Sequence, residues 1–184
     1  NRPGHRHSGW KDRRAGMNWL EWQPNLQATL MFILAEERGE VLLIRKKRGI
    51  GAGKINGPGG KIDPGETPLE CAIRETREEL CVTALHPEKH GELWFEFTDG
   101  LRMLVHVFLA KTHTGEAKET AEAIPLGTRL DRLPLDEMWE DDRYWLKELL
   151  QDHMQFTGRF VFEGERMLAG NMDWGNREWM GKTR

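Results

Sequence analysis

This 184-residue chain has few cysteines, no surplus of positive charge and no long apolar run. Its only cysteines are Cys71 and Cys81, ten residues apart in and at the end of one expected helix. That spacing separates them by roughly 15 Å along the helix axis, which is too far for a disulfide. A disulfide scaffold is therefore excluded, and no spacing of cysteine and histidine is typical of a zinc site.

Charge and hydropathy exclude two further classes of protein. The net charge is −3, whereas a general nucleic-acid binder needs a basic surface for phosphate contacts. No apolar stretch approaches the roughly 20 residues that cross a bilayer, and no signal-type apolar core is present. We expect a cytoplasmic protein without a nucleic-acid or membrane partner, acting as a monomer on a small molecule.

The length fits one compact domain. We expect this domain at residues 26–168, between a flexible N-terminal extension (residues 1–25) and a C-terminal tail (residues 169–184). Residues 1–16 are basic and lack apolar periodicity, a composition typical of disorder. His5 and His7 could bind a metal weakly there, but an exposed tail is the simpler interpretation.

Paired acids follow a glycine-rich turn near the middle of the chain. Over residues 69–80, apolar residues recur every three or four positions, which predicts an amphipathic helix. On that helix Glu75 and Glu79 lie one turn and about 40° apart, so their carboxylates converge. Like charges at this spacing favour a divalent cation, and Mg²⁺ prefers oxygen ligands, including phosphate oxygens. We expect Mg²⁺ as the cofactor, with Mn²⁺ as a substitute.

Other interpretations of this region explain less. A solvated acidic face is the usual meaning of a charge run, but it accounts for neither Gly59-Gly60 nor Glu66. A phosphate-binding loop needs Gly-x4-Gly-Lys-Ser/Thr, and neither Gly-Lys pair of residues 49–61 has these flanking residues. A dinucleotide fingerprint fails because Lys54 stands at its third glycine.

The acids fit the spacing Gly-x5-Glu-x7-Arg-Glu-apolar-x-Glu-Glu-x-Gly-apolar at Gly60, Glu66, Arg74, Glu75, Glu78, Glu79 and Val82. The chain therefore resembles the Nudix hydrolases, whose box has this form. Two positions depart from it, since Thr76 replaces an aliphatic residue and Cys81 replaces a glycine. We expect the Thr76 hydroxyl to bond to a carbonyl one turn earlier. We expect Cys81 at a left-handed helix end, where glycine is more favourable.

Apolar alternation and turn residues predict the remaining elements. Strands are expected at residues 26–35, 41–45, 90–97, 101–110 and 156–163, with an Asp-Gly turn at 98–100 and a second helix at 136–150. Strands interrupted by two helices indicate an α/β protein with a mixed β-sheet sandwiched between helices. The Nudix resemblance implies the same fold.

The resemblance extends beyond the box, over roughly residues 26–165. The additional blocks are similar to the MutT-type Nudix hydrolases of animals, which act on oxidised purine nucleoside triphosphates, and lie at residues 46–49, 51–53, 56–57, 95–97, 105–108 and 139–142. The resemblance implies a metal site of Gly59, Glu75, Glu78, Glu79 and Glu122. It implies catalytic roles for Arg74, Glu75, Glu78 and Glu79. It implies that substrate is bound by Thr29, Lys46, Asn56, Phe95, Met103, Trp139, Asp141 and Asp142, with Lys46 near the phosphates.

These residue types suit a purine. The flat indole of Trp139 can stack on a base, although core packing is its plainer role. Asp141 and Asp142 crowd two carboxyls into one place, where desolvation and repulsion keep at least one protonated as a donor. Ile50 replaces an aromatic residue, as do Ile55 and Gly127, which leaves fewer rings around the base.

The expected activity is Mg²⁺-dependent hydrolysis of a purine nucleoside triphosphate to the monophosphate and pyrophosphate, a reaction that sanitises the nucleotide pool. Glu78 or Glu79 accepts the proton of the attacking water. Two alternatives stay open, a Nudix enzyme for another nucleoside diphosphate derivative and a non-catalytic Nudix-fold binding module. Every acidic box position is intact, which disfavours the non-catalytic module. The preferred base and sugar are left open.

Overall fold

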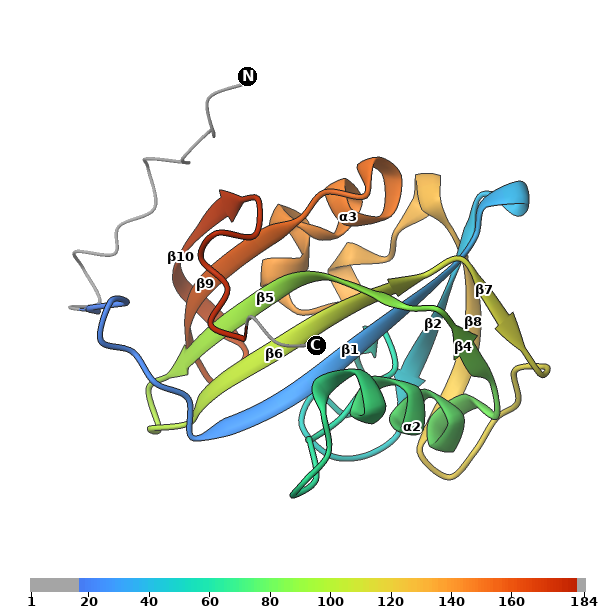
Figure 1. Cartoon of the computed structure of the whole chain (residues 1–184), viewed down its shortest axis with the longest axis horizontal. Coiled ribbons are helices and arrows are strands. Elements are labelled where there is room, and N and C mark those ends of the chain that lie inside the picture. The colour runs from blue at the N-terminus through green and yellow to red at the C-terminus, as the bar shows by residue number, and fades with distance from the viewer. Residues whose placement is uncertain (1–16, 182–184) are drawn as a thin grey trace.

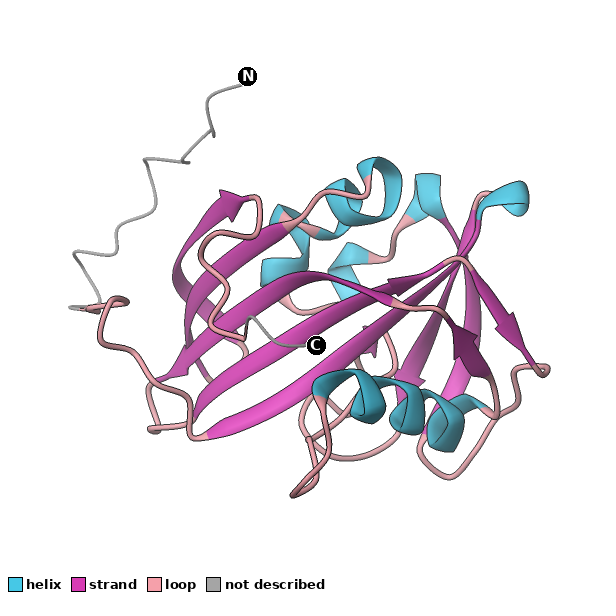
Figure 2. Ribbon diagram, viewed as in Figure 1, coloured by secondary structure: helices cyan, strands magenta, loops and turns pink. Residues whose placement is uncertain are grey.

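The computed structural model describes residues 17–181, which form a mixed β-sheet with helices on both faces (Figure 1, Figure 2). The eight-stranded sheet has the order β10-β9-β5-β6-β1-β2-β3, and β8 also pairs with β2. Its strands are β1 (Leu26–Ala35), β2 (Glu40–Lys46), β3 (Ile55–Asn56), β5 (Glu88–Phe97), β6 (Arg102–Ala110), β8 (Ala123–Arg129), β9 (Phe156–Glu163) and β10 (Arg166–Trp174). A smaller sheet pairs β4 (Thr83–Leu85) with β7 (Thr112–Thr114).

Within residues 17–181 the sheet is accompanied by two α-helices and four short 3-10 helices. The α-helices are α2 (Pro68–Leu80) and α3 (Leu146–Asp152). The 3-10 helices are η1 (Glu36–Arg38), η2 (Leu130–Arg132), η3 (Leu135–Glu137) and η4 (Glu140–Tyr144). β1 runs parallel to β6 and β5 runs parallel to β9, while the other pairs are antiparallel. The expected α/β fold with a mixed sheet between helices is confirmed.

Side-chain alternation along the strands builds a separate core on each face of the sheet. Leu93, Phe95 and Phe97 of β5 point into the larger core under α3, where Trp145 stacks on Phe156 at 5.2 Å between ring centroids. On β1, Phe32 and Leu34 belong to the larger core. Met31 and Ile33, which alternate with them, point to the opposite face and pack under α2 in the second core. The sheet is thus buried on both faces, and α2 is held against β1.

The ends of α2 follow from local chemistry. Thr67 and Glu70 form a capping box, in which the Thr67 hydroxyl accepts from the Glu70 amide at 3.1 Å. The helix ends at Cys81, whose φ of 63° and ψ of 22° are left-handed. The Thr76 hydroxyl donates to the carbonyl of Ala72 at 2.7 Å. Both expectations for the departures from the box are therefore confirmed.

The expected strands are confirmed, with ends displaced by at most two residues. The Asp-Gly turn joins β5 to β6, and Gly100 has a φ of 98°. The single helix expected at residues 136–150 is wrong, because this stretch forms η3, η4 and the start of α3. The backbone of Trp139 is extended, with φ −62° and ψ 145°, and this conformation interrupts the helix.

The boundaries of the expected flanking segments also differ from the structure. The tail expected from residue 169 begins inside β10, which pairs with β9 up to Trp174. Within the expected N-terminal extension, Trp22 is buried and stacks on Trp94 at 5.5 Å between centroids. Residues 1–16, with His5 and His7, lie outside the described residues. No helix within residues 17–181 is long and apolar enough to cross a membrane.

Candidate functional site

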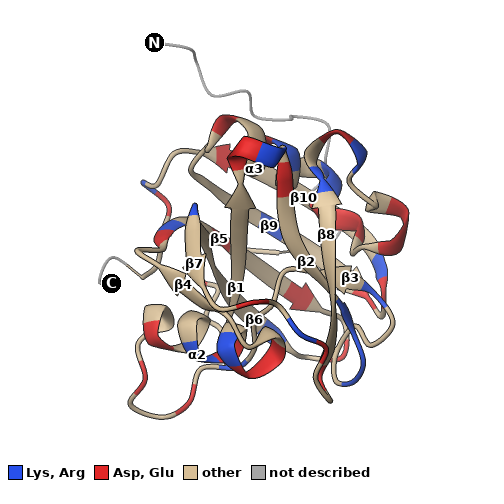
Figure 3. Cartoon of the chain, turned by 90° about the vertical axis from the view of Figure 1, so that its right-hand side faces the viewer, with Lys and Arg blue, Asp and Glu red and all other residues tan. Residues whose placement is uncertain are grey.

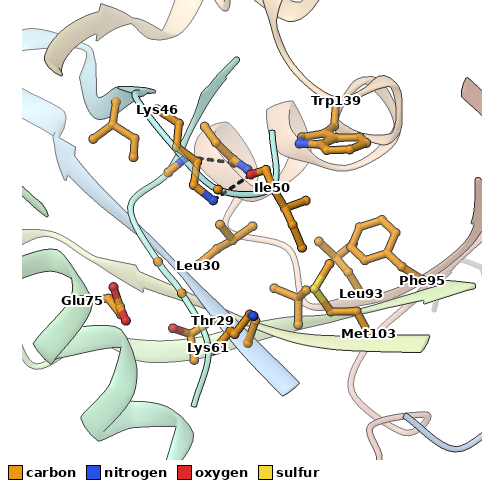
Figure 4. A pocket seen from close by; sticks show the side chains of 18 of the residues that line it. Thr29, Leu30, Lys46, Ile50, Lys61, Glu75, Leu93, Phe95, Met103 and Trp139 are labelled. Carbon is orange, nitrogen blue, oxygen red and sulfur yellow. Dashed lines mark hydrogen bonds between the residues drawn. The ribbon is translucent and has the colours of Figure 1, made fainter. Parts of the chain in front are cut away.

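A cavity of about 430 Å³ gathers residues from β1, the loop after β2, α2, β5, β6 and η4. Figure 4 shows Glu75 and Trp139 on opposite sides of this cavity. The sequence-predicted residues that line it are Thr29, Lys46, Asn56, Gly59, Glu75, Glu79, Phe95, Met103, Glu122, Trp139, Asp141 and Asp142. Arg74 and Glu78 are not among the lining residues. The cavity therefore has an acidic side supplied by α2 and an aromatic side supplied by β5 and the segment at η4.

The acidic side is built on Glu75 and Glu79. The Glu79 side chain accepts a hydrogen bond from the Gly59 amide at 3.2 Å, and the residue is only 5% exposed. Burial is the main cause that raises the pKa of Glu79 to about 8, and the charge of Glu75 contributes to this rise. Burial also raises the pKa of Glu75. Two carboxyls thus face the cavity in a setting where a positive charge would stabilise their ionised forms.

Arg74 pairs with three acids of the box. Its Nε donates to Glu66 at 2.6 Å, and its Nη1 donates to Glu75 at 2.9 Å and to Glu78 at 3.2 Å. The bond from Arg74 lowers the pKa of Glu66 to about 2, which keeps this partner ionised. Figure 3 shows basic and acidic residues side by side along α2. The Glu78 side chain is 56% exposed and pairs with Arg74.

Two consecutive glycines bring the preceding loop against this helix. A Cβ at Gly59 would lie 1.9 Å from the Thr29 carbonyl oxygen, and a Cβ at Gly60 would lie 2.5 Å from the Glu75 carboxyl carbon. The Gly60 carbonyl accepts from the Thr29 amide at 2.9 Å, so the loop follows β1 closely. A side chain at position 59 would clash with the backbone of Thr29, whereas one at position 60 would displace the Glu75 carboxylate from its place beside the cavity.

The residues fit a hard divalent cation in their donor chemistry. Glu75, Glu79 and Glu122 supply carboxylate oxygens, the ligand type that Mg²⁺ and Mn²⁺ take. Within residues 17–181, no three acidic, histidine or cysteine side chains are already gathered around one point. Each of these glutamates instead contacts another group of the protein. Glu75 accepts from Arg74, Glu79 accepts from the Gly59 amide, and Glu122 pairs with Arg48 at 3.2 Å. Small side-chain movements are therefore needed to assemble a complete ligand set.

The other side of the cavity contains two buried acids. Asp141 and Asp142 are 1% and 3% exposed, and Trp145 Nε1 donates to Asp141 Oδ2 at 2.9 Å. Within the described part of the chain, Asp141 Oδ1 and Asp142 Oδ2 have no hydrogen-bond partner. Burial raises the pKa of both carboxyls, and the charge of Asp141 raises that of Asp142 further. Burial thus favours the neutral form of Asp142, the form that the sequence analysis expects for at least one of the two carboxyls.

Trp139 both lines the cavity and packs against the core. Its ring meets Phe97 edge-on at 6.4 Å and Phe162 at 5.6 Å between centroids, with interplanar angles of 81° and 82°. Lys54 Nζ lies 5.4 Å from the ring centroid. The stacking role and the packing role of Trp139 are therefore compatible in one position.

Sequence reasoning missed several residues that line the cavity. They include Leu30, Arg48, Lys61, Leu93 and Phe97. Ile50, which the sequence analysis names near the base, lines the cavity with 45% of its surface exposed. Leu93 and Phe97 stand two residues on either side of Phe95, so strand alternation alone places them on the same face. Lys61 and Arg48 carry no such periodic signal, because they lie in the loops on either side of β3.

Comparison with known proteins agrees with the box and the fold. Residues 24–149 match the family model for the NUDIX domain. An oxidized purine nucleoside triphosphate hydrolase of Danio rerio is 42% identical over 143 residues, which are 76% of this chain and 90% of that protein. An 8-oxo-dGTP diphosphatase of Escherichia coli is 35% identical over 75 residues, which are 34% of this chain and 58% of that protein. The crystal structure of a MutT protein from Bacillus halodurans aligns with a TM-score of 0.71 and 27% identity, over 80% of this chain and 97% of that one. The chain belongs to the Nudix family.

Proposed function

We propose that this protein hydrolyses oxidised purine nucleoside triphosphates to nucleoside monophosphate and pyrophosphate, and so sanitises the nucleotide pool. The observation that supports this most strongly is the pair of buried carboxyls, Asp141 and Asp142, placed in the same cavity as the acids of the box. The Danio rerio hydrolase, whose name states this activity, is 42% identical over 76% of this chain. A cavity of about 430 Å³ lies within the usual range for small-molecule sites.

In this proposal the acidic side binds the metal and the triphosphate. Glu75, Glu79, Glu122 and the Gly59 carbonyl would hold Mg²⁺ or Mn²⁺, with Glu78 nearby. A bound divalent cation neutralises charge on the phosphates and lowers the pKa of the attacking water. Arg74 keeps the glutamates oriented through its hydrogen bonds to Glu75 and Glu78. Glu78 or Glu79 takes the proton of the water.

Lys46 is the proposed contact for the phosphates. Its ammonium donates to the Ile50 carbonyl at 2.7 Å and lines the cavity between the acidic and aromatic sides. An ammonium on a flexible stem can leave a neutral carbonyl for a phosphate oxygen, because the charged acceptor forms the stronger hydrogen bond.

The aromatic side would hold the base. Trp139 offers its face for stacking, while Phe95 and Met103 complete the apolar wall. A protonated Asp142 beside Asp141 presents a donor next to acceptors, which complements the alternating donors and acceptors of a purine edge. Asn56 can donate and accept at the same edge, and Thr29 adds a hydroxyl.

The direct test is a turnover panel with Mg²⁺, in which oxidised and normal purine triphosphates are compared with pyrimidine triphosphates. We expect the highest kcat/KM for an oxidised purine, with pyrophosphate and not orthophosphate as the product. Equal kcat/KM values across the panel would contradict purine recognition. Absence of turnover with every triphosphate would contradict the proposed reaction.

A further inference from the structure

Thr120 lies outside the cavity lining, yet it joins two of the proposed metal ligands. It belongs to the loop between β7 and β8, which passes the C-terminal end of α2 (Figure 1). Its hydroxyl donates to the carbonyl of Glu79 at 2.8 Å. The same oxygen accepts from the amide of Glu122 at 3.2 Å. One side-chain atom therefore connects the residue at the end of α2 to the residue before β8.

The first of these bonds serves the helix end. The last carbonyls of an α-helix have no partner within the helix and need one from elsewhere. In α2 the loop supplies two such partners, the Thr120 hydroxyl for the Glu79 carbonyl and the Lys118 amide for the Leu80 carbonyl at 3.0 Å. The loop that carries Glu122 is thus attached to the last turn of the helix that carries Glu79.

The backbone around Thr120 is fixed by other contacts. The Thr120 amide donates to the Ala123 carbonyl at 3.0 Å, and Lys47 Nζ donates to the Thr120 carbonyl at 2.8 Å. The Lys47 amide donates to the Glu122 carbonyl at 3.0 Å. These bonds hold the loop to the segment that follows β2. Removal of the Thr120 hydroxyl should therefore loosen the attachment of the loop to α2 without unfolding the loop.

We infer that Thr120 is a positioning residue that sets the distance between Glu79 and Glu122, and through it the affinity for the divalent metal. The inference rests on the proposed metal site, in which both glutamates are ligands. The side chain of Glu122 is paired with Arg48 and must move to join Glu79. The hydrogen bond that the Glu122 amide donates to the Thr120 hydroxyl limits the positions that the Glu122 backbone can take during that movement.

The test compares Thr120→Val, which keeps the shape and removes the hydroxyl, with Thr120→Ser, which keeps the hydroxyl. Mn²⁺ is the probe, and its binding is measured without substrate by the electron paramagnetic resonance signal of the free ion. We expect Thr120→Val to bind Mn²⁺ about three- to tenfold more weakly, the effect of a lost hydrogen-bond link, and Thr120→Ser to bind as the parent does. Thermal unfolding confirms that both variants are folded.

A second pair of variants identifies the ligand through which Thr120 acts. In a Glu122→Gln background, Thr120→Val is expected to cause no further loss of Mn²⁺ affinity, because the group it positions has already lost its charge. The same fold-loss in both backgrounds would overturn the inference, as would parent-like binding by Thr120→Val. If Glu122→Gln alone leaves Mn²⁺ binding unchanged, Glu122 is not a ligand and the inference fails with it. The turnover panel on purines tests the base specificity separately.

Discussion

At the scale of single residues, Cys81 stands in a conformation that its type does not favour. Its left-handed φ of 63° brings Cβ close to the backbone, which costs about 1 kcal/mol for an L side chain. The thiol is exposed, so burial does not offset this strain. The strain could be predicted from sequence because glycine is usual at this position of the box.

We expect Cys81→Gly to be neutral or to raise the free energy of unfolding by up to about 1 kcal/mol, because relief of strain competes with the greater unfolded-state entropy of glycine. Urea denaturation measures the difference. Cys81→Ala is the control, since it removes the thiol and keeps Cβ, and it should follow the parent. A lower denaturation midpoint for Cys81→Gly would contradict this account.

Glu79 is a second residue whose environment has a measurable consequence. Burial raises its pKa from 4.5 to about 8, so over this range the folded protein retains a proton that the unfolded chain releases. The stability that this proton contributes is fully present below pH 4.5 and is lost as the pH rises through about 8.

In the presence of a chelator, the parent should therefore lose more unfolding free energy than Glu79→Gln between about pH 5 and pH 8. Denaturation curves at both pH values measure the two losses. Glu78→Gln, at an exposed side chain, is the matched control and should follow the parent. Identical losses for the parent and Glu79→Gln would show that the Glu79 carboxyl does not carry this pH dependence.

At the scale of elements, the local sequence pattern is enough to predict α2 but not the conformation of the segment at η4. The apolar stripe of residues 69–80 predicts α2, and Thr67 begins it through its capping box. The stretch from 136 to 150 has a similar stripe but breaks at Trp139. There the packing of Met138, Trp139 and Trp145 against the larger core outweighs helix propensity, a tertiary effect that the local pattern does not contain.

Thr67→Ala removes one half of the capping box and should lower the free energy of unfolding by about 1 kcal/mol. Thr67→Ser keeps the hydroxyl acceptor for the Glu70 amide and should remain within a few tenths of a kcal/mol of the parent. Chemical denaturation of the three proteins distinguishes these values. Equal destabilisation by both substitutions would mean that the methyl group of Thr67, not its hydroxyl, holds the helix start.

At the scale of the whole molecule, the strands with clear alternation were predictable, whereas β3, β4, β7, β8 and β10 were not. β3 has two residues and β8 contains Pro125 and Gly127, both of which weaken a strand signal. These strands form because β2 offers a partner at each edge. In the candidate site, chemistry and resemblance named the acids and the residues proposed to face the base, while the loop residues Arg48 and Lys61 needed the fold to place them.

The central claim is that one cavity combines a metal-binding acidic side with a purine-reading side, and Asp142 tests it most directly. The measurement is kcat/KM of Asp142→Ala on the best oxidised purine triphosphate and on a poor pyrimidine triphosphate. Loss of one hydrogen bond to a buried polar group predicts an about ten- to hundredfold decrease for the purine and little change for the pyrimidine. Equal decreases for both substrates would contradict the account, because Asp142 would then support the fold and not the recognition of the base.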